Sequence, residues 1–346
     1  METFNSIDDA WVSLMSNLGD AEEHDSRAGP TREVVGWSGR LADSTRNVLL
    51  HPARAMDPAY ACAELLWYLS GERSVEMMCA YAPSYKRFAN PQTEQGHAMG
   101  AYGHRWTSNP GFANQAVEVV ENLDGVTMES QLDAAAILME KRPETRQAVV
   151  TMWDSSDIGE AIVGQANDIP CTIALQFLPR RGKLHAHCYM RSNDAWLGFP
   201  YDVFCFTTIQ RIMARRLGLQ PGSYCHSVGS MHVYEKDRKK LLGGGLLRSL
   251  PEGSGSLRHG YDNDSGTWDV AAALRREKQA RDAVNGGPKL AGVFMASGDP
   301  LADAAEVCCA RLTGRAPTPH GLSPLLMRAW DTKEADKVTT ARKKEH

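Results

Sequence analysis

The sequence predicts an α/β fold in a single domain, with a mixed sheet of about six strands flanked by helices. Three observations lead to this prediction. β-branched runs typical of strands occur along the chain, and other segments have apolar residues every three to four positions, which is typical of helices. The chain also has 346 residues, of which 42% are apolar, so it is long for one domain but has ample material for a core.

The first half of the chain is expected to begin with a helix within residues 1–30. Residues 58–69 are predicted as a second helix, because cysteine and leucine positions recur at helical spacing and Gly71 supplies a C-terminal stop. Residues 81–106 have an irregular pattern with proline, asparagine and glycine, which predicts a loop region. Residues 147–153 are β-branched and predict a strand.

The centre of the chain predicts a hairpin followed by a long helix and a strand. Residues 172–178 and 183–191 are the two hairpin strands, and the proline, arginines and glycine of residues 179–182 suit the turn between them. Pro200 opens the helix, and a later Pro-Gly pair turns the chain into a strand that reaches Tyr234.

The last third of the chain changes in character. Residues 236–288 contain three glycine clusters around a charged, helix-like piece at residues 271–282, and we expect a surface insertion rather than a second domain. Residues 290–296 predict a short strand. The charged tail, residues 333–346, is expected to be mobile. We therefore expect residues 1–346 to form one domain.

Composition excludes several classes of function. The formal net charge of −4 disfavours a nucleic-acid partner, since duplex binding requires a dense basic face. No run approaches the ~20 apolar residues of a spanning helix, so no membrane partner is expected. The start of the chain does not resemble a secretory leader, so the eight cysteines are expected to be reduced thiols in the cytoplasm. Their spacing is unlike that of a zinc site, and no metal is expected.

Cys171 is the first candidate for chemistry. It follows a proline and begins a predicted strand, so its sulfur can face a cleft. Taken alone, a free cysteine is more often a buried apolar residue. Three arginines with anion-binding potential, Arg27, Arg146 and Arg191, favour a nucleophile instead, because positive charge lowers the pKa of a thiol.

Seven motifs in the same order along residues 27–234 resemble the thymidylate synthase family. The most specific is Arg191-Ser192-Asn193-Asp194-Ala195-Trp196-Leu197-Gly198-Phe199-Pro200-Tyr201-Asp202. One such motif is a weak signal, but seven in family order are a strong one. The other six are Glu64-Leu65-Leu66-Trp67-Tyr68-Leu69 with Gly71, Tyr102-Gly103 with Trp106, Pro143-Glu144-Thr145-Arg146, Pro170-Cys171, Gln176-Phe177, and His226 with Gly229, His232, Val233 and Tyr234.

This resemblance implies a covalent mechanism. Cys171 is implied to add to C6 of a pyrimidine, which lets C5 attack the methylene of 5,10-methylenetetrahydrofolate, the co-substrate. Glu64 is implied to organise water and protons around C5, and Tyr102 to lie near the sulfur. A further set of residues is implied to hold the phosphate and ribose of a nucleoside monophosphate: Arg27, Arg191, Ser192, Asp194, His232 and Tyr234.

The resemblance also implies a homodimer in which two sheets stack face to face. In the family, a pair of arginines reaches the phosphate from the partner subunit. Arg146 matches the first of the pair, but Gln147 stands at the position of the second. The set of side chains that binds the phosphate is therefore expected to differ in part from that of the family.

Departures from the family pattern point to cytosine as the base. Asp202 stands where the family carries the asparagine that reads uracil. A protonated aspartic acid matches cytosine's N3 and amino group, and a carboxylate matches the amino group and a protonated N3. The alternative is that Asp202 only caps the helix opened by Pro200. Thr172 replaces a usual histidine near O4, and Met190 replaces a usual glutamine.

Other departures concern the folate side of the site. Tyr85 and Phe88 match two tryptophans that line the folate site in the family. Aromatic side chains that can stack on the pterin are therefore retained, although they are not tryptophans. The indole missing at Tyr85 is associated with a hydride step, so its absence favours capture of the exocyclic methylene by water. The tail also lacks the short apolar ending that closes the family's site.

The leading hypothesis is 5-hydroxymethylation of CMP or dCMP, with tetrahydrofolate regenerated. One alternative is a thymidylate synthase or other (d)UMP-modifying enzyme with an unusual base-reading residue. Another is an inactive relative that binds nucleotides or RNA. The choice between ribose and deoxyribose stays open, although the small Ala174 near the nucleophile leaves room. So does the choice between phage DNA modification and nucleoside-antibiotic biosynthesis.

Overall fold

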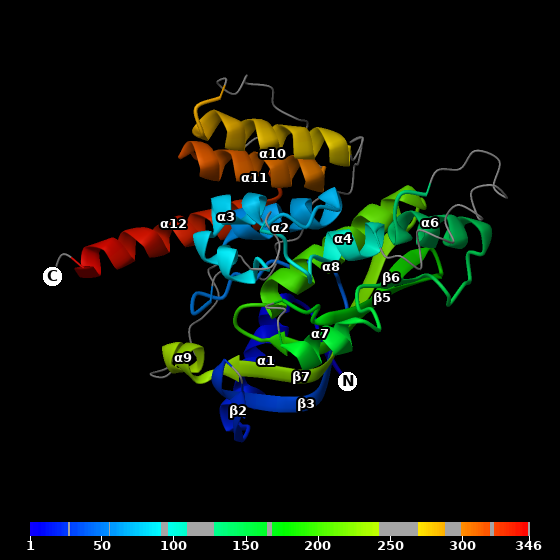
Figure 1. The fold of residues 1–346 in the computed structure, drawn as a ribbon, viewed down its shortest axis with the longest axis horizontal. Helices are drawn as coiled ribbons and strands as arrows, with labels where there is room; N and C mark the ends of the chain where they lie inside the picture. The colour runs from blue at the N-terminus through cyan, green and yellow to red at the C-terminus, as the bar shows by residue number, and fades with distance from the viewer. Residues whose placement is uncertain are drawn as a thin grey trace.

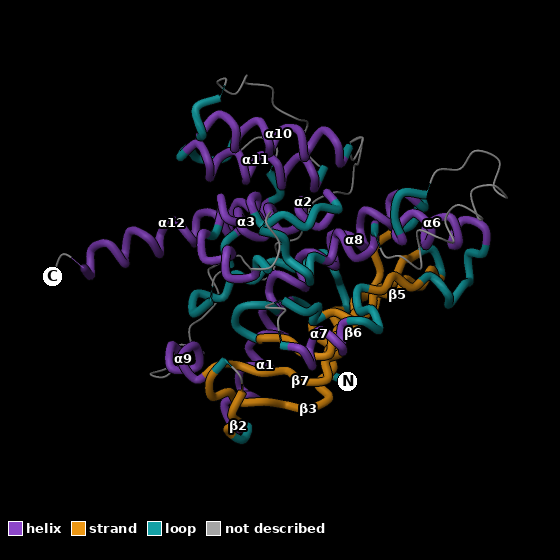
Figure 2. Tube along the Cα trace, in the orientation of Figure 1, coloured by secondary structure: helices purple, strands orange, loops and turns teal. Residues whose placement is uncertain are grey.

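The computed structural model describes residues 1–26, 28–54, 56–90, 96–108, 128–164, 168–241, 269–287, 299–318 and 322–344. A seven-stranded mixed sheet forms one layer, and a stack of helices lies on one side of it (Figures 1 and 2). This confirms the predicted α/β architecture. The sheet has one strand more than the expected six.

The sheet combines parallel and antiparallel pairs in the order β1-β3-β7-β6-β5-β4, with β2 paired to β3. The pairs β1–β3 and β6–β7 are parallel, and the other pairs are antiparallel. The strands are β1 (Glu2–Phe4), β2 (Glu23–Ser26), β3 (Gly29–Leu41), β4 (Val149–Thr151), β5 (Thr172–Arg180), β6 (Lys183–Asp194) and β7 (Gln220–Tyr234).

The predicted hairpin is confirmed as β5–β6. Arg181 and Gly182 connect its strands with φ values of 51° and 73°, the left-handed conformations of a tight two-residue turn. Helix α8 (Phe199–Arg216) then carries the chain from β6 to its parallel neighbour β7, and Pro200 lies in its first turn. This crossover brings the end of β6 and the start of α8 to the same place.

Helix α2 (Pro58–Ser70) lies at the centre of the molecule. Asp57 caps its start by accepting hydrogen bonds from the backbone N–H groups of Ala59 and Tyr60, and Gly71 ends it with a φ of 71°. It is buried nearly all round, as expected for a helix between two layers. The sequence prediction of residues 58–69 is confirmed to within one residue.

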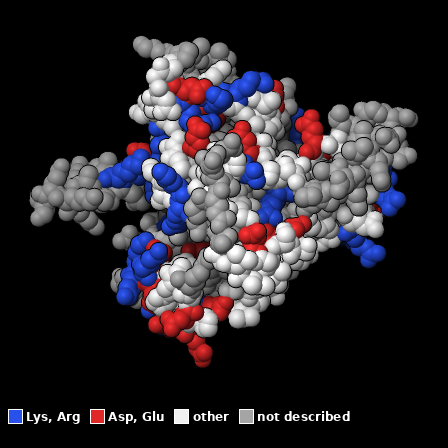
Figure 3. Space-filling model, viewed as in Figure 1, with Lys and Arg blue, Asp and Glu red and all other residues white. Residues whose placement is uncertain are grey.

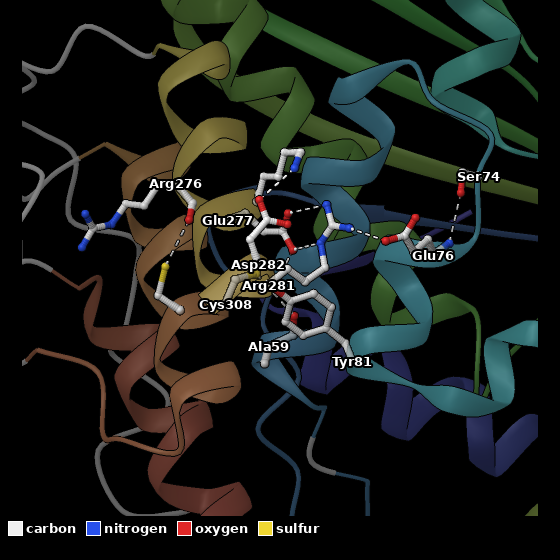
Figure 4. A network of polar contacts seen from close by, with 11 residues as sticks. Ala59, Ser74, Glu76, Tyr81, Arg276, Glu277, Arg281, Asp282 and Cys308 are labelled. Atoms are coloured by element: carbon white, nitrogen blue, oxygen red, sulfur yellow. Dashed lines mark hydrogen bonds and ion pairs between the residues drawn. The ribbon is translucent and has the colours of Figure 1, made fainter. Parts of the chain in front are cut away.

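A second group of helices packs on the side of α2 remote from the sheet (Figure 1). It comprises α3 (Glu76–Tyr81), α10 (Val270–Val284) and α11 (Pro300–Thr313), next to the start of α12 (Pro324–Lys344). Figure 4 shows the polar contacts that join them: Glu277 of α10 accepts hydrogen bonds from Tyr81 of α3 and from Arg281. We call α3, α10 and α11 the helical layer.

Part of the C-terminal third of the chain belongs to this helical layer. The helix-like piece predicted at residues 271–282 is α10, and it buries Ala273, Arg276, Glu277 and Ala280. Residues 242–268 of the expected insertion and the strand expected at 290–296 lie outside the described residues. The charged tail continues α12 as far as Lys344.

The loop region predicted between Tyr81 and Trp106 is wrong in part. A 3-10 helix, η1 (Pro83–Phe88), follows α3 directly, and α4 (Tyr102–Thr107) comes later. Each spans only six residues, too few to display a helical repeat in the sequence. Packing holds α4 in place: a Cβ atom at Gly103 would lie 2.1 Å from the carbonyl oxygen of Tyr68 on α2.

The remaining helices are short or peripheral: α1 (Ile7–Asp20), which confirms the predicted first helix, α6 (Gln131–Lys141), α7 (Asp157–Val163), α9 (Glu235–Arg238) and η2 (Lys239–Leu241). In the part of the chain that the structure describes, no helix is long and apolar enough to span a membrane. All eight cysteines are free thiols. Figure 3 shows acidic and basic side chains interspersed over the face viewed.

Candidate active site

Cys171 lies just before β5 and beside Arg191 of β6. The Nη2 atom of Arg191 is 3.7 Å from the Cys171 sulfur. The guanidinium is fixed by hydrogen bonds to the carbonyl oxygens of Pro170 (2.9 Å) and Ile169 (3.0 Å), and it lies over the Trp153 ring at 5.7 Å. The cation next to the thiol is therefore held by the same segment that presents Cys171.

The ionisation of Cys171 differs from the expectation. Burial raises the pKa of the thiol to about 11, against the lowering influence of Arg191. The carboxyl groups of Asp202, Asp168 and Asp194 raise it further. The expected cation is present, but burial outweighs it because the charged thiolate loses solvation. At neutral pH the Cys171 side chain is therefore a thiol.

Tyr102 lies close to Cys171 in the structure. Its hydroxyl oxygen accepts a hydrogen bond from the backbone N–H of Thr172, the residue after Cys171, at 3.2 Å. Burial raises the pKa of this phenol well above its ordinary value, so it stays protonated. Among the described residues, the buried hydroxyl of Thr172 has no hydrogen-bond partner.

Glu64 projects from α2 into the same region and is 7% exposed. Burial raises its pKa to about 8, and the nearby charge of Asp202 adds to the shift. The Tyr60 hydroxyl donates a hydrogen bond to Glu64 Oε1 at 3.0 Å, which favours the carboxylate and limits the rise. Glu64 can therefore exchange a proton near neutral pH. Tyr60 was missed at the sequence level, although its i, i+4 spacing from Glu64 was visible.

Asp202 lies in the first turn of α8, is 8% exposed, and does not cap the helix. The N-cap residue is Gly198, and no side chain makes a capping hydrogen bond there. Instead, Asp202 Oδ2 accepts a hydrogen bond from Asn193 Nδ2 at 2.7 Å. Burial raises the pKa of Asp202 to about 7, Asn193 lowers it, and Asp194 raises it. Asp202 therefore makes no capping hydrogen bond, although its place in the first turn is one at which an aspartate favours the helix start.

Three of the expected phosphate and ribose ligands lie together at the ends of β6 and β7. Ser192 Oγ is 3.4 Å from His232 Nδ1, and the rings of His232 and Tyr234 meet edge to face at 5.4 Å. Asp194 Oδ1 accepts hydrogen bonds from the backbone N–H groups of Trp196 (2.8 Å) and Leu197 (3.0 Å), so this side chain shapes the loop before α8. Arg27 lies outside the described residues.

Tyr85 and Phe88 form an aromatic wall on η1. Their ring centroids are 4.9 Å apart, and Tyr85 packs edge-on against Trp67 of α2 at 5.6 Å and near Tyr60 at 6.4 Å. The wall therefore adjoins the helix that carries Glu64. Such an apolar surface beside a buried carboxyl suits a planar heterocycle.

Arg146 is separate from this cluster within one chain. Its carbonyl oxygen accepts a hydrogen bond from the side chain of Gln176, at a point about 16 Å along β5 from Cys171. Among the residues described, Arg146 makes no hydrogen bond or ion pair with another predicted site residue. Gln147 accepts a hydrogen bond from Arg142 at 3.4 Å.

Asp168 is a second residue that the sequence did not single out. It accepts a hydrogen bond from the backbone N–H of Gly100 at 3.0 Å, and burial raises its pKa to about 6. A Cβ atom at Gly100 would lie 2.8 Å from Asp168 Oδ2, so only glycine permits this contact. Within the described residues, no group of histidine, cysteine, aspartate or glutamate side chains is placed to hold a metal ion.

A family model described as thymidylate synthase matches residues 11–249. The match covers more than half of the chain and runs from α1 past β7. It includes Glu64, Cys171, Arg191 and Asp202.

Proposed function

The chain belongs to the thymidylate synthase family, and we propose that it hydroxymethylates C5 of a cytosine nucleotide, CMP or dCMP. Family membership implies a one-carbon transferase that acts on a pyrimidine nucleotide with 5,10-methylenetetrahydrofolate as co-substrate. The proposal adds the base and the fate of the transferred carbon.

The observation that carries the proposal is Asp202. By the resemblance it stands at the position of the family's base-reading asparagine; in the structure it is buried and bonds to Asn193 rather than to the helix end. As a carboxylate it accepts hydrogen bonds from cytosine's amino group and from a protonated N3, whereas with uracil one of its oxygens faces O4, another acceptor. As a neutral acid it donates to one atom and accepts from another, which suits either base. An ionised Asp202 therefore matches cytosine when N3 carries the proton, and it does not match uracil.

The chain's own residues account for the proposed steps. Cys171 sulfur forms a bond to C6, which makes C5 the nucleophile for the methylene carbon. After C5 has bonded to the methylene carbon, Glu64, with a pKa of about 8, takes up through water the proton that leaves C5. Loss of this proton breaks the bond between the methylene carbon and the folate nitrogen, so tetrahydrofolate leaves and an exocyclic methylene remains on C5. Water then adds its hydroxyl to the methylene, and expulsion of the Cys171 sulfur from C6 as a thiolate, which takes up the remaining proton, restores the aromatic ring. Near the exocyclic carbon, Tyr85 would present a phenol ring where the family has an indole.

A (d)UMP-modifying activity is the second candidate, and the pKa of Asp202 favours it at low pH. With a value of about 7, a large fraction of Asp202 is protonated in mildly acidic solution and can donate to uracil's O4. Preference for cytidylate over uridylate should accordingly rise as the pH increases through about 7. Release of tritium from 5-³H-labelled CMP, dCMP, UMP and dUMP with the folate measures this preference directly.

The variant Asp202→Asn provides the sharpest test. The amide pairs with N3–H and O4 of uracil but mismatches neutral cytosine, a cost of roughly 1–3 kcal/mol, or one to two decades in preference. We expect loss of tritium release from cytidylate and gain from uridylate. A wild type that prefers uridylate at every pH, or a variant with unchanged preference, contradicts the proposal.

A homodimer is part of the proposal. Arg146 does not reach the Cys171 cluster within one chain, and an arginine supplied by a second chain would complete the phosphate site. Sedimentation should give twice the 38.0 kDa mass of the chain, and a monomer at working concentration would exclude this arrangement.

A further inference from the structure

Asn193 is a buried amide whose position at the end of β6 has a consequence for Asp202. It is 3% exposed, and its Nδ2 atom donates to Asp202 Oδ2 at 2.7 Å and lies 2.8 Å from the Met190 sulfur. A thioether is a weak acceptor, so the carboxyl is the main partner. Among the described residues, the other amide atom, Asn193 Oδ1, has no hydrogen-bond partner although it is buried.

That unpaired oxygen argues against a packing role for the amide. Burying an acceptor without a partner costs stability, and an apolar side chain of the same size avoids that cost. What asparagine offers here and leucine does not is the N–H group aimed at Asp202. The hydrogen bond to Oδ2 leaves Oδ1 as the oxygen of Asp202 with no partner among the residues described.

We propose that Asn193 is a positioning residue that sets base specificity: its amide holds Asp202 as a carboxylate with Oδ1 turned toward the base. This inference rests on the proposed function. A carboxylate oxygen accepts from cytosine's amino group and repels uracil's O4, because both are acceptors. A protonated Oδ1 would instead donate to O4 and admit uracil. Asn193 favours the first state because its N–H stabilises the charged form.

Other titratable groups around Asp202 must be separated from it in any pH experiment. Carboxyls and thiols face it from four places: Glu64 on α2, Asp194 at the end of β6, Cys171 before β5, and Cys188 and Cys205 on β6 and α8. Four phenols surround it as well, Tyr68, Tyr85, Tyr102 and Tyr224, and burial raises all their pKa values well above 10.

Burial also raises the pKa values of the three thiols, so only the two carboxyls titrate near Asp202. Asn193 donates to Asp202 and to neither Glu64 nor Asp194 in the described contacts. A shift caused by changing Asn193 therefore reports Asp202.

The test compares Asn193→Leu with the wild type by tritium release from 5-³H-labelled cytidylate and uridylate between pH 6 and 9. Loss of the N–H should raise the pKa of Asp202. The pH at which the preference for cytidylate rises should therefore increase by about one unit. At pH 7.5 the preference should fall roughly threefold, because the neutral fraction of Asp202 rises by about that factor. Asn193→Asp, which is isosteric and adds a second carboxyl, should move the profile in the same direction.

Asn47→Leu is the matched control. Asn47 is another fully buried amide bonded to α8, through the Thr207 hydroxyl at 2.6 Å, whereas the hydrogen bond of the Asp202 carboxyl in the described residues comes from Asn193. Its loss should lower stability without moving the pH profile. An unchanged profile and preference in both Asn193 variants overturns the inference, as does an equal shift in Asn47→Leu. If the wild type itself prefers uridylate throughout, the proposed function fails instead.

Discussion

Buried and half-buried carboxyl groups in two regions of this molecule have different partners. In the helical layer, Glu277 is 1% exposed and accepts hydrogen bonds from Arg281 at 2.9 and 3.2 Å and from Tyr81 at 3.0 Å (Figure 4). Glu306 pairs with Arg315 at 2.6 Å; although burial raises its pKa, Arg315 and Thr318 hold it below the ordinary value. These carboxyls are both paired with arginine side chains.

Around Cys171 the buried carboxyls have neutral donors instead. Tyr60 donates to Glu64 and Asn193 donates to Asp202, and among the described residues neither carboxyl forms an ion pair with lysine or arginine. Their pKa values rise to about 8 and about 7, chiefly through burial. The partner of a buried carboxyl therefore indicates its role. A carboxyl beside an arginine is held in its charged form and serves the structure, whereas a carboxyl beside a neutral donor can exchange a proton at working pH.

The largest expected effect comes from the nucleophile. Cys171→Ala should lower C5 tritium release by at least about 1,000-fold, since the covalent route is removed. Nucleotide binding should largely survive, because phosphate and ribose contacts do not involve the sulfur. Cys79→Ala, which removes a half-buried thiol on α3, should keep activity within a few-fold. Retained turnover in pure Cys171→Ala would remove the nucleophile assignment.

The Cys171→Ala variant also tests whether each active site combines residues from two chains. If Arg146 serves the partner's site, Arg146→Ala and Cys171→Ala homodimers should both be impaired. Mixed dimers would then contain one site with both residues intact. Recovery of activity on mixing supports the shared arrangement, and its absence in verified heterodimers contradicts it.

Matched Glu→Gln changes should have opposite effects on stability in the two regions. Glu277→Gln weakens the ion pair with Arg281, and we expect a loss of about 1–3 kcal/mol of unfolding free energy, with activity per folded molecule unchanged. Glu64→Gln removes a carboxyl whose pKa is raised on folding. A group of this kind loses stability as pH rises from its unfolded pKa near 4.5 to its folded value of about 8.

Glu64→Gln should therefore match the wild type near pH 4 and be more stable by about 1–4 kcal/mol near pH 8, while turnover falls by about 100-fold or more. Urea unfolding at both pH values measures the first effect and tritium release the second. If Glu277→Gln and Glu64→Gln both lower the unfolding free energy at pH 8, the proposed difference between the two regions is wrong.

Local signals made the fold largely predictable, and the site less so. The helix at Pro58–Ser70 and the turn at Arg181-Gly182 follow from neighbouring residues, because caps and turns depend on local backbone chemistry. Motif order singled out Glu64 and Asp202, which lie far apart in the sequence but interact electrostatically. Burial was not visible in the sequence. Counting arginines therefore predicted a low pKa for Cys171, and the protein raises it.

The smallest expected effect tests a neutral donor in each region. Tyr60→Phe keeps the ring that packs on Tyr201 at 4.6 Å but removes the hydroxyl that donates to Glu64. Because this hydrogen bond favours the carboxylate, its loss should raise the pKa of Glu64 by about 0.5–1 unit. The limb of the pH–rate profile that reports Glu64 should move upward by the same amount, whichever protonation state is active.

Tyr81→Phe is the control for this prediction, since its hydroxyl donates at the same 3.0 Å to Glu277, a carboxyl that also has Arg281. We expect a stability loss of about 0.5–1.5 kcal/mol and no change in the pH–rate profile, because Glu277 lies in the helical layer and not in the cluster around Cys171. Profiles of kcat and kcat/KM for both variants decide the matter. A shift in Tyr81→Phe as large as that in Tyr60→Phe would mean that the profile follows general loosening of the fold, and the contrast between neutral and cationic partners would then explain nothing about proton exchange.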